Sequence, residues 1–91
     1  MIQSFADETT RLLAEGKTVR KIPPALQRQA NKRLSFLTLA KRIEDLYVPP
    51  SNQFHALAGS DRHAISVNNQ WRITFTWSPS GPGDVLFEDY H

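Results

Sequence analysis

The sequence contains no cysteine, and this absence removes several kinds of chemistry at once. Disulfide bonds, thiolate metal sites and cysteine nucleophiles are all excluded. There is also no glycine-rich phosphate loop and no G-x-S-x-G turn, which excludes P-loop nucleotide sites and serine-hydrolase nucleophiles. No apolar run approaches the roughly 18 residues that a membrane span needs. Any chemistry must therefore come from charged and hydrogen-bonding side chains.

The first ten residues, MIQSFADETT, carry acidic residues where a secretory signal peptide would carry basic ones. We therefore expect this segment to belong to the fold and the protein to be cytoplasmic. At 91 residues the chain has the length of one domain, and we assign residues 1–91 to it. A domain of this size buries roughly two-thirds of its unfolded surface, so its core is thin and a protein partner would add stability.

Charge is distributed unevenly along the chain, although the formal net charge is only +2. The window from Lys17 to Arg42 holds eight basic residues and no Asp or Glu. A block of one sign is typical of a surface that binds phosphate groups, above all those of nucleic acid. The alternative is a solvated helix face that is basic without any partner.

Hydrophobic periodicity predicts two helices in the first half of the chain. Asp7 is expected to cap a helix that runs to about Glu15. Apolar residues at helical spacing predict a second helix over Pro24–Ala40, with proline in its first turn. Phe36 and Leu39 are expected to widen the buried side of this second helix.

From residue 54 the hydrophobic period becomes strand-like. The segment 68–70, Asn-Asn-Gln, is expected to form a hairpin turn because asparagine tolerates positive φ. The expected strands cover residues 1–5, 54–57, 64–67, 71–77 and 85–89, with one further helical turn at 43–47. The prediction is an α+β fold of order β-α-α-β-β-β-β, in which an N-terminal strand and two helices precede a twisted antiparallel four-strand meander.

The three histidines are His55, His63 and His91, and no two of them have the spacing of metal ligands. No metal site and no cofactor is therefore expected. His91 is the last residue, where the α-carboxylate and Asp89 would favour its imidazolium form. The alternative is a frayed end without a role, which is common for terminal residues.

Arg72 lies on the most strand-like run of the chain, Trp71–Trp77. Alternation places Arg72, Thr74 and Thr76 on one face and the aromatic residues on the other. A polar face with an arginine can hold a phosphate, although a lone arginine there is as often only solvated or ion-paired. His55 lies on another expected strand of the same sheet and can be brought into register with Arg72.

Three motifs resemble those of the HigB-type toxins, which belong to the RelE/ParE superfamily of bacterial toxin–antitoxin systems. They are N-x-x-W-R-I-x-F at residues 68–75, A-I-S-V-N at residues 64–68 and E-D-Y-H at residues 88–91. The opening M-I-x-S-F, K-T-x-R at 17–20, E-D-L at 44–46 and P-P-x-N at 49–52 agree in order and position. The resemblance therefore covers essentially the whole chain.

The resemblance implies a toxin that acts as a ribosome-dependent, metal-independent mRNA endoribonuclease and so inhibits translation. It also implies the partners of such a toxin. These are the ribosome at its 30S A site with its mRNA, a cognate HigA-like helix-turn-helix antitoxin, and operator DNA bound through that antitoxin. No membrane partner is expected.

Carried over position by position, the resemblance also implies which residues act. Arg72 would stabilise charge on the phosphate, and Tyr90 would stack on or hydrogen-bond an RNA base. His91 or Asp89 would be the base and His55 the acid, and these two labels are interchangeable. The basic residues expected to bind RNA and the ribosome are Lys17, Arg20, Lys21, Arg28, Lys32, Arg33 and Arg62.

The segment after His55 departs from the family pattern. Many relatives have L-K-G there, but Ala58 stands in place of that lysine, and a tryptophan often found before the I-S-V run is also absent. Losing the lysine would weaken catalysis or shift its task to Arg62 or His63. Two alternatives stay open: a ParE-like inhibitor of DNA gyrase that cleaves nothing, and a weakly active module that serves as an antitoxin-dependent corepressor.

Overall fold

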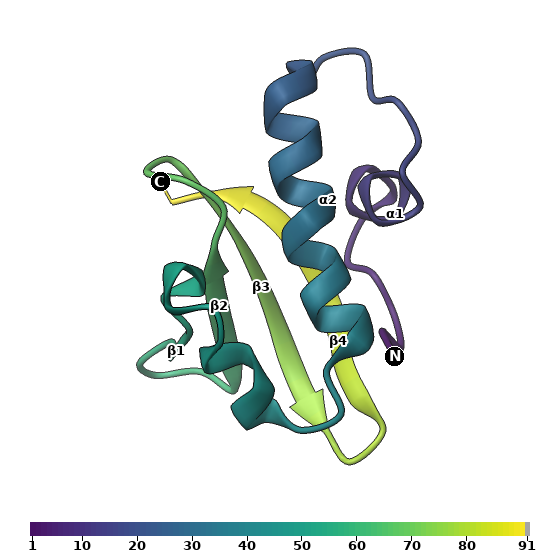
Figure 1. Ribbon diagram of the computed structural model, residues 1–91. Coiled ribbons are helices and arrows are strands. Elements are labelled where there is room, and N and C mark those ends of the chain that lie inside the picture. The colour runs from purple at the N-terminus through teal and green to yellow at the C-terminus, as the bar shows by residue number, and fades with distance from the viewer. Residues whose placement is uncertain (91) are drawn as a thin grey trace.

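The computed structural model describes residues 1–90 and has two α-helices, two 3-10 helices and four strands (Figure 1). In chain order these are α1 (Glu8–Ala14), α2 (Pro24–Leu39), η1 (Ile43–Tyr47), η2 (Pro50–Asn52), β1 (His55–Ala56), β2 (Arg62–Ser66), β3 (Trp71–Ser78) and β4 (Gly81–Asp89). The arrangement confirms the predicted α+β fold class. Within residues 1–90, none of the helices combines the length and apolar character that crossing a bilayer requires.

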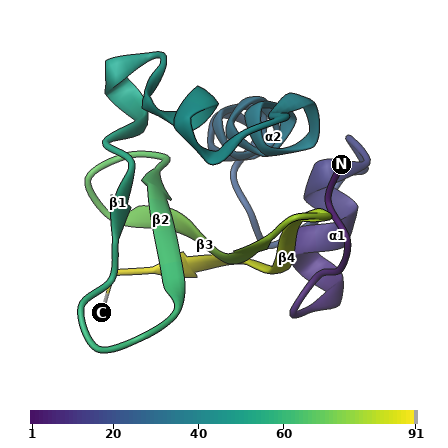
Figure 2. The same cartoon turned by 90° about the horizontal axis from the view of Figure 1, so that it is seen from below.

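The four strands form one antiparallel sheet in the order β1-β2-β3-β4, so each strand pairs with its neighbour in sequence. α2 lies across one face of the sheet, and the 3-10 helices continue that layer past its C-terminal end (Figures 1 and 2). α1 lies beside β4 at the edge of the sheet (Figure 2). Within the described chain, no helix covers the opposite face of the sheet.

A narrow apolar stripe on α2 joins the two layers. Ala30, Leu34 and Leu37 are buried and belong to the same core cluster as Ile73 and Phe75 of β3. Burying such a side chain contributes roughly 1.5–3 kcal/mol, so this stripe decides which side of α2 faces the sheet. The expectation that Leu39 widens the stripe is wrong. Leu39 is the last residue of the helix and turns into solvent, where its side chain is 75% exposed.

The first helix begins where the sequence predicts. Asp7 Oδ1 accepts the backbone N–H of Thr10 at 2.8 Å and the Thr10 hydroxyl at 2.6 Å, which caps α1. The Thr10 hydroxyl oxygen in turn accepts the backbone N–H of Phe87 at 2.9 Å. This chain of hydrogen bonds, which is buried at Thr10 and Phe87, ties the start of α1 to β4.

The opening segment differs from the prediction because it does not become a regular strand. Phe5 forms an isolated parallel bridge with Val85, and the Gln3 N–H donates to the Pro82 carbonyl at 2.8 Å. Asp84 of β4 has a φ of 46°, which interrupts the regular strand geometry of β4 where residues 1–5 lie beside it. Residues 1–5 therefore run beside β4 and bond to it through separate hydrogen bonds, without forming a continuous strand ladder.

The turn between β2 and β3 forms where predicted but by a different mechanism. None of the described residues from 67 to 70 has a positive φ. Instead, Asn68 Oδ1 accepts the backbone N–H groups of Gln70 and Trp71, each at 2.8 Å. The asparagine thus stabilises the turn through its side chain, and the expectation of a positive φ is wrong.

Candidate functional site

The face of the sheet opposite α2 carries polar side chains from three adjacent strands. Arg72 and Thr74 of β3 lie on this face, whereas Ile73 and Phe75 are buried on the α2 side as predicted. The strand register pairs Arg72 with Ser66 of β2 and with Glu88 of β4. Directly paired residues of antiparallel strands point to the same face, so the three side chains converge.

Hydrogen bonds join Arg62, Thr74, Arg72 and Glu88 into what we call the sheet-face network. Arg72 Nη2 donates to Glu88 Oε2 at 3.1 Å, in an ion pair whose side chains are 21% and 30% exposed. The Thr74 hydroxyl donates to the other carboxylate oxygen of Glu88 at 3.1 Å. Arg62 Nη2 donates to the Thr74 hydroxyl at 2.9 Å and to the Asp84 carbonyl at 2.7 Å. Each guanidinium is therefore held in a defined place.

Arg72 also contacts Tyr90 beyond the end of β4. Its Cζ lies 5.2 Å from the centre of the Tyr90 ring, within the range of a cation–π contact. The Tyr90 N–H donates to the Gln70 carbonyl at 2.9 Å, which fixes the backbone at this point. Arg72 Nε is buried without a hydrogen-bond partner among residues 1–90. A buried donor is costly to leave unpaired, so an acceptor beside this guanidinium would be stabilised.

His55 lies on the same face as Arg72 but at the far edge of the sheet. His55 pairs with Ala64, which in turn pairs with Thr74. Because two strand spacings separate them, the backbones of His55 and Thr74 lie about 10 Å apart. Its Nδ1 lies 2.8 Å from the Gln53 carbonyl oxygen. Because a carbonyl can only accept, Nδ1 carries a proton, and Nε2 of this exposed ring is the atom that can exchange a proton with a ligand.

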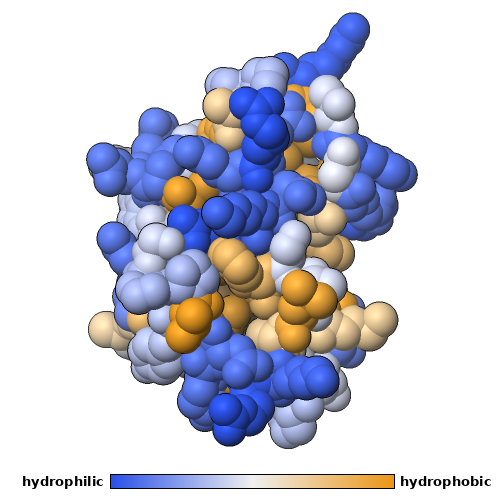
Figure 3. All heavy atoms as spheres, viewed as in Figure 1, coloured by the Kyte–Doolittle hydropathy of each residue, from blue (hydrophilic) through white to orange (hydrophobic). Residues whose placement is uncertain are grey.

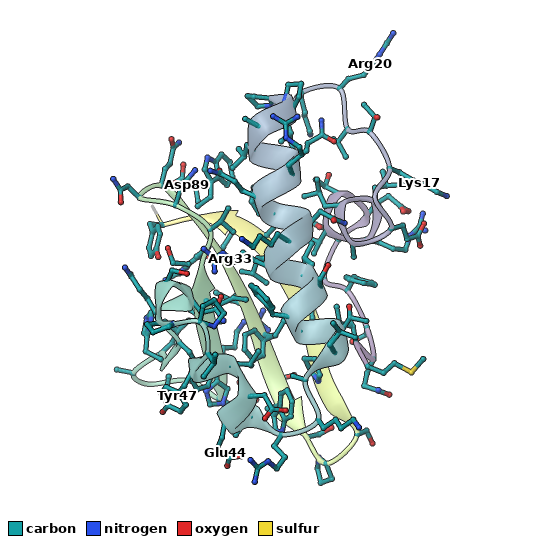
Figure 4. The ribbon with its side chains drawn as sticks, in the orientation of Figure 1. Lys17, Arg20, Arg33, Glu44, Tyr47 and Asp89 are labelled. Atoms are coloured by element: carbon teal, nitrogen blue, oxygen red, sulfur yellow. The ribbon has the colours of Figure 1, made fainter. Side chains whose placement is uncertain are left out.

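Asp89 lies on the other face of β4. Its strand partner is Trp71, which packs against the core on the α2 side. Gln70 Nε2 donates to Asp89 Oδ2 at 3.0 Å, and Figure 4 shows Asp89 at the end of the sheet. The structure thus places Asp89 and Arg72 on opposite faces of the sheet, although the sequence predicts both as catalytic residues. The remaining predicted catalytic residue, His91, lies outside the described residues.

His63 points away from the sheet-face network. Its ring stacks on Phe54 and Phe75, with centroid distances of 5.6 and 5.9 Å, on the side of the sheet that faces α2. Ala58 is exposed in the turn that follows β1. Of the two residues named as replacements for a lysine at this position, only Arg62 lies on the polar face.

Sequence reasoning gave no role to Glu88, because a β-bulge brings it into the site. Counting back from the Ser78–Gly81 pair at the turn would place Phe87 opposite Arg72. The register instead shifts between Thr74 and Thr76, so that Arg72 pairs with Glu88. A bulge adds one residue to one strand and reverses which side chains face which way beyond it. The only sequence signal for Glu88 is its place in the terminal E-D-Y-H.

Five of the predicted RNA-binding cations lie together on the helical side. Lys17, Arg20 and Lys21 are on the loop between α1 and α2, Arg28 and Lys32 are on α2, and all five are exposed. Figure 4 shows Lys17 and Arg20 directed away from the body of the molecule. A hollow of about 320 Å³ between the two helices has Lys17 and Arg28 in its lining. We call these five residues the helix-side cations.

The other two predicted RNA-binding residues are bonded within the protein. Arg33 Nη1 donates to Asn52 Oδ1 at 2.7 Å, and its Cζ lies 5.8 Å from the centre of the Phe36 ring. The first contact ties α2 to η2, and the second lies within α2. Arg62 belongs to the sheet-face network. A part for either residue in RNA binding stays a prediction.

The polar face combines groups that suit a phosphodiester ligand. It offers two fixed guanidinium groups, a histidine with an exposed ring nitrogen and a phenol beside one guanidinium. Guanidinium groups bind phosphate through several donors, and aromatic rings stack on unpaired bases. Within residues 1–90, no three His, Asp or Glu side chains are placed to hold a metal ion together.

Comparison with known proteins shows to which family the chain belongs. A family model described as the RelE-like toxin of the type II toxin–antitoxin system HigB matches residues 3–91. The chain belongs to this family. Toxin HigB-1 of Vibrio cholerae serotype O1 (strain ATCC 39315 / El Tor Inaba N16961) is 34% identical over 65 residues, which cover 69% of this chain and 68% of that toxin. The family resemblance inferred from the motifs is confirmed, and a toxin of a type II system has an antitoxin as its partner.

Proposed function

We propose that this HigB-like toxin is a ribosome-dependent, metal-independent endoribonuclease that cleaves mRNA in the 30S A site and so inhibits translation. The observation that carries the proposal is the sheet-face network, which lies on the same face as His55 and Tyr90. We further infer that the toxin acts in the cytoplasm. A HigA-like helix-turn-helix antitoxin would neutralise it and bring the pair to operator DNA.

Cleavage begins when a base removes the proton of the 2′-OH next to the scissile phosphate. The 2′-oxygen attacks phosphorus, and the 5′-oxygen of the next nucleotide leaves with a proton from an acid, giving a 2′,3′-cyclic phosphate and a 5′-OH. We assign these transfers to His55 and His91, with base and acid interchangeable; Asp89 is less suited than His91 to be the second group, because it lies on the other face of β4. The hydrogen bond from Nδ1 to Gln53 supports His55, because it leaves Nε2 to face the substrate. Such acid–base help contributes about 10²- to 10⁴-fold.

Arg72 is the residue that we assign to the charge developing on the phosphate. A guanidinium has five N–H donors, and Glu88 accepts from Nη2, so other donors remain for phosphate oxygens. A cation that is already in place stabilises the transition state without further reorganisation. The ion pair with Glu88 provides this preorganisation, and Glu88 is therefore a positioning residue.

Tyr90 is suited to contact the RNA base. The Arg72 guanidinium lies over the Tyr90 ring, with its Cζ 5.2 Å from the ring centre. Stacking on aromatic rings is a common way for proteins to hold unpaired RNA bases. A base stacked on Tyr90 would place its attached phosphate beside Arg72, which links substrate binding to charge stabilisation.

The helix-side cations are suited to ribosomal RNA. They lie on the α1 and α2 side, whereas the sheet-face network lies on the uncovered face of the sheet. Phosphate contacts of this kind are independent of sequence and weaken steeply with salt. Docking through one side would leave the other side to meet the mRNA.

The test is primer-extension mapping of a defined mRNA on purified ribosomes, comparing the intact protein with a version that lacks residues 90 and 91. We expect cuts within A-site codons that disappear on truncation. Cuts that persist would assign the chemistry to His55 and Arg72 alone. No cuts from the intact protein at any concentration would contradict the proposal, and a gyrase supercoiling assay would then detect the alternative inhibitor.

A further inference from the structure

One apolar surface is left uncovered on the side of the molecule that carries α2. Among the described residues four large apolar side chains are mainly exposed, and three of them are Leu39 (75%), Tyr47 (60%) and Val48 (72%). Phe36 and Ile43, on the same two helices, are half-buried against the core. Single exposed apolar residues are ordinary, but a cluster is typical of a protein-binding site. We call these five residues the α2–η1 patch.

The patch lies at the junction where α2 ends and η1 begins. Figure 3, in the view of Figure 1, shows apolar atoms gathered over the C-terminal end of α2 and the 3-10 helices, between more polar regions. Tyr47 is braced edge-on against Phe54, with centroids 4.9 Å apart. Asp45 Oδ2 accepts the backbone N–H groups of Lys41 and Arg42 at 2.9 and 3.1 Å. The patch is therefore formed before any partner binds.

Positive charge that lacks a partner flanks the patch. Lys41, which lies between α2 and η1, forms no ion pair within residues 1–90. The nearby Asp45 carboxylate is committed to its own backbone, where hydrogen bonds from Arg42 and Lys41 lower its pKa. A partner that covers this region needs apolar side chains at the centre and acidic side chains around them.

We propose that the α2–η1 patch is the docking surface for the cognate antitoxin. The antitoxin segment that binds here carries bulky apolar side chains at helical spacing, flanked by Asp and Glu, and lays its apolar face on the patch. The family supplies a partner of the required kind, because a type II system pairs the toxin with an antitoxin. The inference rests on this family membership and not on the proposed nuclease activity.

The test measures the affinity of the full-length toxin for its purified cognate antitoxin, immobilised on a biosensor. We expect Leu39→Glu and Val48→Glu each to weaken binding about tenfold or more, and the double variant about 100-fold. Lys41→Glu should weaken binding severalfold at low salt and less at high salt. The control is Asn69→Glu, at an exposed turn position outside the patch. It adds the same single negative charge as Leu39→Glu or Val48→Glu, and its affinity for the antitoxin should stay within twofold of the wild type. If a charged variant does not fold, the same affinity measurement is made with Leu39→Ala and Tyr47→Ala instead.

Two results would overturn this proposal. One is a double variant that binds the antitoxin within twofold of the wild type. The other is a toxin that sediments as a dimer by itself and dissociates in the double variant, which would assign the patch to a second copy of the chain. Primer extension with the same variants separates the two proposals, because the docking result stands whether or not the toxin cuts mRNA.

Discussion

The uncovered face of the sheet and the face of α2 use positive charge in different ways. On the sheet, Arg72 and Arg62 are bonded to neighbouring strands, and Glu88 supplies a carboxylate 3.1 Å from Arg72. On α2, Arg28 and Lys32 are exposed and form no ion pair within residues 1–90. A paired, partly buried guanidinium has one geometry, which suits chemistry. Unpaired surface cations act at longer range, which suits docking of a large partner.

Apolar exposure separates the two faces as well. The sheet face has its polar groups linked by hydrogen bonds of 2.7–3.1 Å, and Thr74 at its centre is 1% exposed. The helical side exposes Leu39 and Val48 at its end. The two proposals made above place catalysis on one side of the sheet and partner binding on the other, so a substitution on one side should leave the task of the other side intact.

The largest effect should come from Arg72→Ala. This change removes the cation from the proposed phosphate site, and we expect cleavage to fall by about 10²-fold or more. Single-turnover cleavage of ribosome-bound mRNA measures this, with thermal unfolding followed by circular dichroism as the control for folding. Wild-type rates from a folded Arg72→Ala variant would remove Arg72 from the mechanism.

A smaller effect should come from Glu88→Gln, which keeps the shape of Glu88 but removes its charge. We expect the maximal rate to fall about tenfold, of the order expected when a group that orients a reacting partner is lost, while the KM for mRNA is unchanged or lower because a negative charge has gone. Glu44→Gln, on the helical side, is the matched control and should have no effect. If Glu88 acts through Arg72, Glu88→Gln should not slow the Arg72→Ala variant further; an additional tenfold loss would contradict this.

On the α2 side, we expect Arg28→Gln combined with Lys32→Gln to weaken ribosome association severalfold and to lower its salt dependence. The reason is the loss of up to two phosphate contacts, each of which releases counterions. Pelleting with ribosomes at several salt concentrations measures this. Asn69→Glu with Ser80→Glu makes the same change in net charge elsewhere and should keep the salt dependence. An unchanged salt dependence in the α2 variant would show that these cations do not meet RNA.

The smallest effect concerns the junction that supports the α2–η1 patch. Hydrogen bonds from the backbone N–H groups of Arg42 and Lys41 lower the pKa of Asp45. A carboxyl group whose pKa is lowered by folding adds stability above its unfolded pKa and loses that stability as pH falls through the folded value. Asp45→Ala should therefore melt slightly below the wild type near neutral pH and approach it in strong acid. A difference in melting temperature that is independent of pH would contradict this role.

Local patterns were enough to predict much of the fold and part of the site. The Asp7 cap and the burial of Leu34 and Leu37 follow from neighbouring residues on one helix, where spacing fixes direction. The face of Arg72 follows equally from alternation along β3. Such features need no knowledge of how distant segments pair.

Features that depend on pairing between strands were not predictable in the same way. Glu88 reaches Arg72 only because a bulge shifts the register by one residue, and the same shift leaves Asp89 on the other face. The sequence predicts the last strand only from residue 85, although β4 already begins at Gly81 and includes Asp84 with its φ of 46°. The exposure of Leu39 depends on where α2 leaves the sheet, which its helical spacing does not reveal.

The measurement that tests the division between the two faces most directly applies both assays to two variants. Arg72→Ala and the Leu39→Glu, Val48→Glu double variant are each assayed for mRNA cleavage on ribosomes and for affinity to the antitoxin. We expect Arg72→Ala to lose cleavage and keep antitoxin binding, and the double variant to keep cleavage and lose antitoxin binding. Variants that lose both properties together while remaining folded would contradict the account, because the two faces would then act as one surface.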